Sequence, residues 1–450
     1  MTEPSLTRGR PASGAGALMR ILGLGFGLAV IVGSTLGIGI LRTPGLVAAQ
    51  LSTRSSILAV WLVGGLYTLI GSVCLTELGT MLPQAGGYYV YARKAFGETT
   101  GFIVGWTDWL TYCAVLGYVS IAIGEFSSVL VPSLEPWIKL VAIAALVCLA
   151  LLQSAGVRVS GRFQELTTGI KFLAFLALVG ACFVHAASAP AFHASLASSP
   201  APAPGFIGLV VALQSVVITY GGWQSALYFT EEDPDPDRNL PRSMIGGVLA
   251  VLVVYMLVNA ALLAVLPVPA LAGSKLAAAD AAQVIFGTRG GQLITLLSLV
   301  SLPPMINAIL MIGTRILFAI GRDGLLWRGV AAVNRRGTPA TATAVTTAVA
   351  IALVASGTFQ TLVGVASFFL AVNYCVCCLA LIVLRRREPL LPRPFAAWGY
   401  PWSAGVVLVG AAAFLLGVIW GDTRTAVVAV GLLLAGLGWK VVRPVNSPQA

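Results

Sequence analysis

Charge is scarce in this sequence, because Asp, Glu, Lys and Arg account for 10% of its 450 residues while hydrophobic residues account for 58%. A soluble globular domain carries about 25% charged residues, so this composition excludes that class. The mean hydropathy of +0.92 indicates an integral membrane protein instead.

Motifs of catalysis and metal binding are also missing. The sequence has only two histidines, His185 and His193, to which we assign no chemistry, and it has no HExxH, GxSxG or nucleotide-binding loop. All seven cysteines fall within apolar segments, and the group Cys375, Cys377 and Cys378 lacks the spacing of metal ligands. We therefore expect no enzyme activity, no cofactor and no bound metal.

Apolar runs long enough to cross a membrane recur along the whole chain. An α-helix needs about 20 residues to span about 30 Å of hydrocarbon, and the ten-residue alternation of a membrane β-barrel is not visible. The sequence therefore predicts an all-α integral membrane protein with twelve transmembrane helices. These helices are expected at residues 21–50, 57–82, 101–130, 136–153, 163–185, 206–229, 243–266, 291–320, 340–355, 361–384, 403–420 and 425–442.

Basic residues are distributed unequally between the loops. The net charge is +11, and nineteen of the 27 Lys and Arg residues fall in the tails and loops on the side of the N-terminus. The opposite side holds only Arg54, Lys139, Lys275, Arg289 and Arg424. This is the positive-inside pattern, so we expect a multi-pass protein of the cell membrane with both termini in the cytoplasm. The charge indicates contact with the lipid bilayer rather than with nucleic acid.

Two of the apolar segments are interrupted at corresponding positions. The first contains GSTLGIGILRTPG at residues 33–45, and the sixth contains TYGGW at residues 219–223. If segments one to five and six to ten are repeats, the odd number of helices in each makes the two copies inverted. We therefore predict a 5+5 inverted repeat with discontinuous first and sixth helices. The alternative for GSTLG is a small-xxx-small face that packs against another helix.

Unwound backbone inside a membrane needs polar partners, because lipid cannot satisfy free N–H and C=O groups. A ligand that carries both a carboxylate and an ammonium group can provide them. Free N–H groups at the start of a half-helix favour the carboxylate, aided by the helix dipole, and free carbonyls accept from the ammonium. The two breaks therefore predict a zwitterionic substrate, chiefly an amino acid.

Lys171 is the most unusual charged residue of the apolar segments. It lies about eight residues into the fifth segment, or about 12 Å from its inner end. A lysine at that depth is costly and is a candidate for function. The alternative is a side chain that extends to the cytoplasmic interface.

Five motifs resemble one known family in their order along the chain. They are GSTLGIGI in the first segment, TELGTMLP at 76–83, YGGW with TEE at 220–232, RDG at 322–324 and LRRR at 384–387. Together they resemble the amino acid, polyamine and organocation transporter superfamily, and within it the L-type amino acid transporter branch. The similarity covers residues 20 to about 400 and implies a LeuT-like secondary transporter that works by alternating access.

The resemblance also implies a substrate site at the two breaks. The substrate carboxylate would bind the backbone of the first break, and the α-amino group would bind carbonyls around Ile218, Thr219 and Tyr220. Ile218 stands where an aromatic gate residue is common. Lys171 stands where a lysine can replace a coupling sodium ion, and its ammonium could also carry protons. The expected substrate-binding residues are Gly33, Ser34, Thr35, Leu36, Gly37, Ile218, Thr219, Tyr220, Gly221, Gly222 and Trp223.

Arg42 stands where the family usually has an apolar residue. It could contact an acidic substrate or pair with a gate carboxylate such as Glu125, and the alternative is a side chain that reaches the outer headgroups. Trp223 could close the floor of the site or pack as an ordinary aromatic residue.

The other polar residues of the apolar segments are expected to have structural roles. Glu77 and Asp108 are expected at an interface or in structural pairs rather than in a proton relay. Asn307 and Arg315 lie eight residues apart and are expected on one helix face, where they order the bundle. The acidic run EEDPDPDRN at 231–239 is expected to be a solvated loop.

The chain is therefore expected to have four parts: a disordered cytoplasmic tail at 1–20, a ten-helix transport core at 21–400, two peripheral helices at 401–442 and a cytoplasmic tail at 443–450. Its expected function is sodium-independent transport of free L-amino acids, either by exchange or in symport with protons. The alternatives are a polyamine or organocation exchanger and a membrane amino acid sensor. Residues 127–137 lack the cysteine that links eukaryotic L-type members to a heavy chain, so no such partner is expected.

Overall fold

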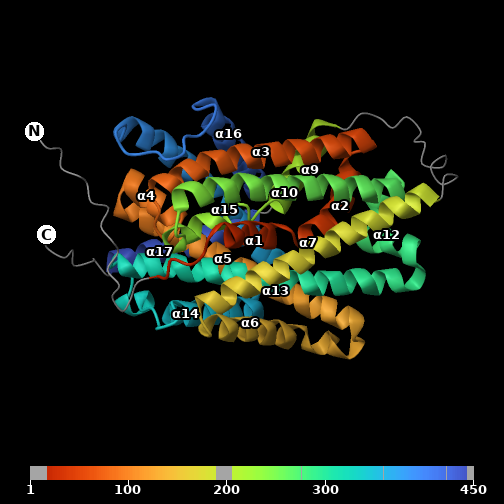
Figure 1. Cartoon of the computed structure of the whole chain (residues 1–450), viewed down its shortest axis with the longest axis horizontal. Helices are drawn as coiled ribbons and strands as arrows, with labels where there is room; N and C mark the ends of the chain where they lie inside the picture. The colour runs from red at the N-terminus through yellow and green to blue at the C-terminus, as the bar shows by residue number, and fades with distance from the viewer. Residues whose placement is uncertain (1–17, 189–204, 275, 358, 422, 443–450) are drawn as a thin grey trace, which may run out of the picture.

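The computed structural model describes residues 18–188, 205–274, 276–357, 359–421 and 423–442. All regular structure in these residues is helical, and the long helices run side by side along the long axis of the molecule (Figure 1). The all-α prediction is thus confirmed for the described residues. The predictions for residues 1–17 and 443–450, for His193 and for Lys275 lie outside them.

The helical elements follow the predicted apolar segments closely. The first half of the chain contains α1 (Leu24–Thr35), α2 (Ile38–Gln50), α3 (Arg54–Met81), α4 (Tyr88–Phe96), α5 (Glu98–Leu130), η1 (Pro132–Trp137), α6 (Ile138–Ser154) and α7 (Val157–Ser188). The second half contains α9 (Phe206–Thr219), η2 (Ser225–Glu232), α10 (Pro236–Val265), α11 (Val268–Gly273), α12 (Ala277–Phe286), η3 (Gly287–Arg289), α13 (Gly290–Arg322), η4 (Arg328–Ala331), α14 (Ala340–Ser356), α15 (Phe359–Arg387), α16 (Trp402–Gly421) and α17 (Thr423–Val442).

Eight helices of the described chain are long and apolar enough to cross a membrane, and α1 with α2 makes a ninth candidate if the bent pair is one span. Three further apolar helices are shorter, namely α9, α14 and the Ala426–Gly438 part of α17. The membrane character of the protein is therefore evident, whereas twelve spans remain a prediction.

The helix α1 lies at the centre of the molecule, between α7, α10 and α13 (Figure 1). Its sequence LGFGLAVIVGST is apolar on all sides, and a helix of that kind is stable when other helices surround it. Eight of its twelve residues are buried. The end of α1, where the first break occurs, is therefore enclosed by protein rather than lipid.

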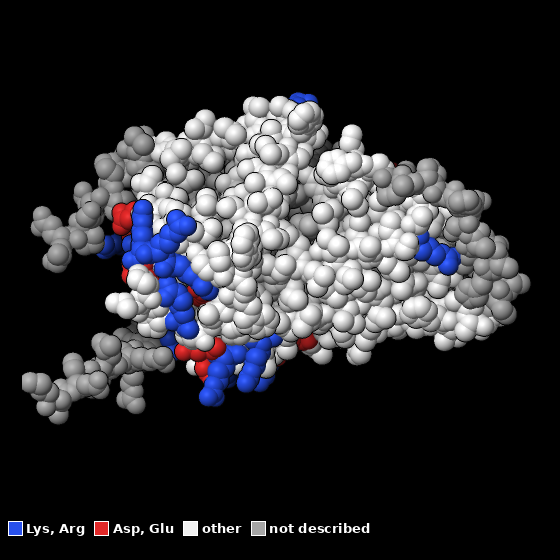
Figure 2. Space-filling model, turned by 90° about the horizontal axis from the view of Figure 1, so that it is seen from above, with Lys and Arg blue, Asp and Glu red and all other residues white. Residues whose placement is uncertain are grey.

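Basic side chains gather at one end of the molecule, together with several acidic ones (Figure 2). We call this the basic end. It is defined by Arg93 and Lys94 of α4, Arg322 of α13 and Arg385 of α15, which pair there with carboxylates from other elements. The large white surface beyond it in Figure 2 matches the long apolar helices, which suits a membrane environment.

Candidate substrate site

The first break separates α1 from α2, which are bent by 44° relative to one another. Leu36 and Gly37 connect the two helices, and Gly37 caps α2 without any side-chain hydrogen bond. The first N–H groups of a helix have no acceptor within it, and together with the helix dipole they favour an anion. The start of α2 can therefore hold a carboxylate.

The second break lies between the end of α9 at Thr219 and the start of η2 at Ser225. Gly222, in its middle, has a φ of +113°, and an added Cβ there would lie 2.8 Å from the carbonyl carbon of Ser34. The φ value favours glycine, and the close approach excludes any side chain. The hydroxyls of Ser34 and Ser225 are 2.8 Å apart. The two breaks are therefore in direct contact.

A cavity of about 360 Å³ opens where the two breaks meet, a volume within the usual range for small-molecule sites. The start of α2 faces it through Gly37, Ile38 and Gly39. The structure brings together seven of the eleven expected substrate residues along its wall, namely Ser34, Thr35, Gly37, Ile218, Thr219, Gly221 and Gly222.

The other four expected residues do not line this cavity. Leu36 is fully buried in an apolar cluster, and the ring of Tyr220 packs against that of Tyr255, with centroids 4.9 Å apart. Trp223 packs against Tyr374, with centroids 5.7 Å apart, and borders a separate small pocket. Trp223 is thus a packed aromatic residue in this conformation rather than the floor of the cavity. The fourth residue, Gly33, contacts Lys171 through its carbonyl.

Lys171 of α7 ties the end of α1 to a neighbouring helix. Its Nζ donates to the carbonyl oxygen of Gly33 at 2.8 Å and to that of Ser301 in α13 at 3.1 Å. The side chain is completely buried and does not extend to the interface. An added Cβ at Gly33 would lie 2.2 Å from Nε2 of Gln164, so α1 and α7 are in close contact here. Among the described residues, Lys171 forms no ion pair.

Two residues that connect the breaks, Tyr255 and Thr43, were not predicted from the sequence as part of the site. The hydroxyl of Tyr255 in α10 lies 2.7 Å from the carbonyl oxygen of Thr35 and 3.0 Å from that of Thr219, so it links the ends of α1 and α9. The hydroxyl of Thr43 lies 2.7 Å from that of Thr219. The position of Tyr255 inside an apolar run could have indicated such a contact, because a buried tyrosine hydroxyl usually has a hydrogen-bond partner.

Arg42 lines the cavity, and Glu125 pairs with it. Nη2 of Arg42 is 3.8 Å from Oε2 of Glu125, and their side chains are 36% and 39% exposed. The Arg42 guanidinium also lies over the ring of Phe126, 5.6 Å from its centroid. Arg42 lines the cavity and is the only charged residue to do so in the described chain. Ile218 lines the same cavity and is 41% exposed.

The basic end is closed by a fully buried ion pair. Both carboxylate oxygens of Glu232 accept from Arg315, at 2.8 and 2.9 Å, and neither side chain is accessible. The neighbouring Glu231 accepts from the backbone N–H of Ala85 and pairs with Arg322. The prediction of a solvated loop at 231–239 is therefore wrong for Glu232, because the end of η2 packs against α13 and buries it. Glu231 remains partly exposed.

Glu77 has the structural role that was expected. It is fully buried and pairs with Arg385 and Arg393, and it accepts from the backbone N–H of Ala397. Arg93 pairs with Asp323 at the same end of the molecule. These contacts join α3 to α15 and α4 to the end of α13 at the basic end.

Asn307 and Arg315 order α13 against different neighbours. Nδ2 of Asn307 donates to Oε1 of Gln164 in α7 at 2.9 Å, whereas Arg315 contacts Glu232 of η2. The expectation that both residues order the bundle is consistent with these contacts. The two residues were expected on one face of the helix, but they contact different partners.

Comparison with known proteins identifies the family. The family model described as "Amino acid permease" matches residues 27–442. The chain is 27% identical to the serine/threonine exchanger SteT of Bacillus subtilis over 429 residues, which cover 93% of this chain and 96% of that protein. It is 29% identical to the Asc-type amino acid transporter 1 of Mus musculus over 445 residues, which cover 90% and 82% of the two chains. It is 28% identical to the large neutral amino acids transporter small subunit 2 of Homo sapiens over 453 residues, which cover 91% and 83%.

The match extends over nearly the whole chain and includes both breaks, and the similar proteins carry the names of amino acid transporters and exchangers. The resemblance drawn from the five sequence motifs is thus confirmed. The chain belongs to the amino acid permease family within the amino acid, polyamine and organocation transporter superfamily, in its L-type branch.

Proposed function

We propose that this protein is a sodium-independent secondary transporter of amino acids that works by alternating access. The observation that carries the proposal is the meeting of two helix breaks at one cavity, with the uncapped start of α2 in its wall. The N–H groups of that helix start would bind the substrate carboxylate. The carbonyl oxygens of residues 218–220 would accept hydrogen bonds from the ammonium group. Each carbonyl oxygen has two lone pairs, so one can bind the substrate while the other keeps its present partner.

Lys171 supports the sodium-independent part of the proposal. Its ammonium group already lies between the carbonyl oxygens of Gly33 and Ser301, where it provides the positive charge that a bound cation would otherwise supply. A sodium ion at the same carbonyls would have to displace it. We infer that the lysine holds α1 in register with α13 without the help of sodium.

The present conformation supports alternating access. The cavity is bordered by Arg42 and Leu46 of α2 away from the basic end, while the Glu232–Arg315 and Glu77–Arg385 pairs close the basic end. Access from the other side requires these pairs to separate. In this proposal the core at 21–400 consists of two inverted five-helix repeats within a twelve-span chain, and the helices at 401–442 are peripheral.

The orientation that we propose places the basic end in the cytoplasm. Its excess of Lys and Arg follows the positive-inside rule, and it implies cytoplasmic termini and a cavity open to the outside in this conformation. Residues 127–137 contain no cysteine, which supports a chain that works without a disulfide-linked heavy partner.

The cavity wall favours a neutral amino acid as substrate. The described lining residues include no carboxylate, which disfavours polyamines because their second ammonium group would lack a counter-charge. Hydroxyl and amide groups of Thr111, Tyr112, Gln224 and Ser367 alternate in the wall with apolar side chains. Because one relative is named a serine/threonine exchanger, we propose exchange as the mode of transport.

Arg42 and Glu125 are proposed as an outer gate whose pairing tightens when the cavity closes. Replacing Arg42 by Gln is expected to lower the uptake of every substrate by about threefold to tenfold. The loss is moderate because the pair is partly exposed in this conformation and becomes stronger only when the cavity closes. Uptake by reconstituted protein measures this. Unchanged uptake of all accepted substrates would refute the gate, and a selective loss of acidic substrates would instead assign Arg42 to substrate recognition.

The function as a whole is tested with purified protein in liposomes. Labelled amino acids are supplied as a panel, with and without a sodium gradient, a proton gradient and internal amino acid. We expect uptake that needs internal amino acid and ignores sodium. Saturable binding without accumulation would indicate a sensor, and sodium-dependent uptake would contradict the role of Lys171.

A further inference from the structure

Asp108 is a buried carboxyl group that the transport cycle described above does not use. It lies on α5, ten residues after Glu98, or about 15 Å along the helix, and its exposed fraction is 0%. Of the two expected positions, the interfacial one is wrong, because Asp108 is enclosed; its structural partner is the hydroxyl of Tyr228, and it forms no ion pair with any described residue. An isolated carboxyl group at this depth is a candidate for function.

The hydrogen bonds of Asp108 are incomplete. The hydroxyl of Tyr228 donates to its Oδ2 at 2.8 Å, while its Oδ1 is buried without a hydrogen-bond partner. The side-chain amide of Asn373 in α15 lies against the carboxyl group and interacts with it, but neither its Nδ2 nor Oδ1 of Asp108 has a hydrogen bond of good geometry. A buried acceptor on α5 and a buried donor on α15 therefore face one another without a well-formed hydrogen bond, which allows the site to adjust when the carboxyl group gains or loses a proton.

Among the residues that the structure describes, no cation pairs with Asp108. The titratable groups that face Asp108 are phenols and a thiol, namely Tyr88 of α4, Tyr112 of α5, Tyr228 of η2, and Tyr374 and Cys377 of α15. Arg315 of α13 and Arg93 of α4 pair with Glu232 and Asp323. Burial of an unpaired charge is costly, and a bound proton removes that cost.

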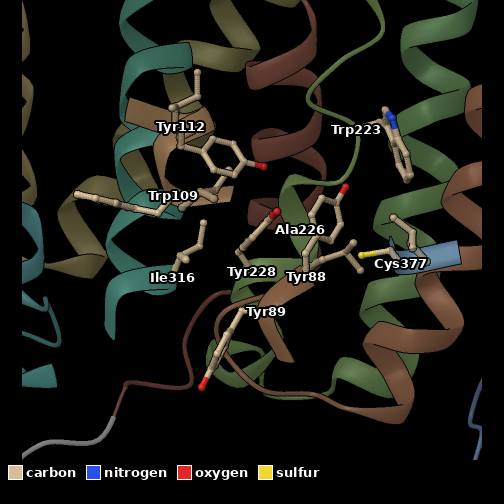
Figure 3. Packing of buried hydrophobic residues seen from close by; sticks show 14 of the residues in the cluster. Tyr88, Tyr89, Trp109, Tyr112, Trp223, Ala226, Tyr228, Ile316 and Cys377 are labelled. Carbon is tan, nitrogen blue, oxygen red and sulfur yellow. The ribbon is translucent and has the colours of Figure 1, made fainter. Parts of the chain in front are cut away.

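A row of polar groups leads from the cavity to Asp108. Tyr112 and Gln224 line the cavity, and Nε2 of Gln224 lies 3.4 Å from the hydroxyl of Tyr112. The ring of Tyr112 meets that of Tyr228 edge-on, with centroids 5.4 Å apart. Figure 3 shows Tyr88, Tyr112 and Tyr228 converging from three different elements. The side chains of Tyr112 and Tyr228 interact, and Tyr228 donates to Asp108, so contacting phenol groups connect the carboxyl group to the cavity.

We propose that Asp108 is a proton-binding site of the transport cycle, a step that rests on the proposed function. A proton from cavity water converts the carboxylate to a carboxyl group, and the same proton passes to water at the basic end when the ion pairs there separate. A charged acceptor holds a donor about twice as strongly as a neutral one. Protonation therefore loosens the bond from Tyr228, and with it the contact between η2 and α5.

The proposal is tested by the pH dependence of uptake into liposomes and by a pH-sensitive dye trapped inside them. For the unmodified protein we expect uptake to fall by up to about tenfold per pH unit on the alkaline side, as for one titrating group, and substrate to bring protons inward. Asp108→Asn is expected to lose both properties. Asp280→Asn, the same change at an exposed residue of α12, is expected to keep them.

A second variant covers the case in which Asp108→Asn does not fold. Tyr228→Phe keeps the carboxyl group but removes its hydrogen bond, so we expect the pH profile to move along the pH axis while its slope is retained. The proposal is overturned if the unmodified protein transports amino acids independently of pH, or if both variants keep its profile and midpoint. If the unmodified protein transports no amino acid, it is the proposed function that fails.

Discussion

Replacing Lys171 by Met is expected to lower amino acid uptake by about 100-fold. The change removes two hydrogen bonds from a charged donor, to Gly33 and Ser301, and such bonds contribute about 1.5–3 kcal/mol each. Because 1.4 kcal/mol corresponds to about a factor of ten, even the lower value for each bond gives the stated loss. Uptake into liposomes under exchange conditions measures it.

Lys139→Met is the matched control for this prediction. Lys139 also donates to a carbonyl oxygen, that of Ala355, but it lies at the surface, where a substitution changes stability by no more than about 0.5 kcal/mol. We expect nearly unchanged uptake for this variant. If Lys171→Met transported as well as Lys139→Met, the lysine would have no part in the cycle.

Replacing Glu232 by Gln is expected to lower the free energy of unfolding by about 3–5 kcal/mol, because it leaves the buried charge of Arg315 without its partner. Both side chains are inaccessible and both carboxylate oxygens are used. The free energy of unfolding is measured on purified protein in detergent.

The same variant should open the basic end more often, which is measured as faster labelling of a cysteine introduced there.

The neighbouring residue provides the control for Glu232. Glu231→Gln is the same change in a pair with Arg322 that is partly exposed, and such pairs contribute no more than about 1 kcal/mol. The amide oxygen can still accept from the N–H of Ala85. Equal losses of stability in the two variants would show that the buried pair does not hold the basic end closed.

The breaks were predictable from the sequence because they depend on local chemistry. Glycines at 33, 37 and 39 and the pair Gly221-Gly222 loosen a helix wherever they occur, and lipid tolerates such a segment only where protein or ligand satisfies its backbone. The depth of Lys171 along its helix also follows from residue spacing alone. These features led to the correct family and to seven of the residues that line the cavity.

The partners that cross between distant helices were not predictable in this way. Glu232 was predicted to be solvated because it is followed by Asp and Pro in the sequence. Its partner Arg315 lies 83 positions away, and only tertiary packing brings Glu232 and Arg315 together. Tyr255 joins the breaks from α10 for the same reason. Asp108 was expected at an interface or in a structural pair, but it is enclosed, and its partner is the hydroxyl of Tyr228, 120 positions away. Such contacts depend on helix rotation and register, which a single sequence leaves open.

The most direct test of the substrate site is a structure of the protein with a transported neutral amino acid bound. We expect the carboxylate within hydrogen-bonding distance of the N–H groups at Gly37, Ile38 and Gly39, the ammonium group at the carbonyls of residues 218–220, and Lys171 still on the carbonyl of Gly33. An amino acid whose carboxylate lies on Arg42, with no contact to the backbone of either break, would contradict recognition by the opened helices.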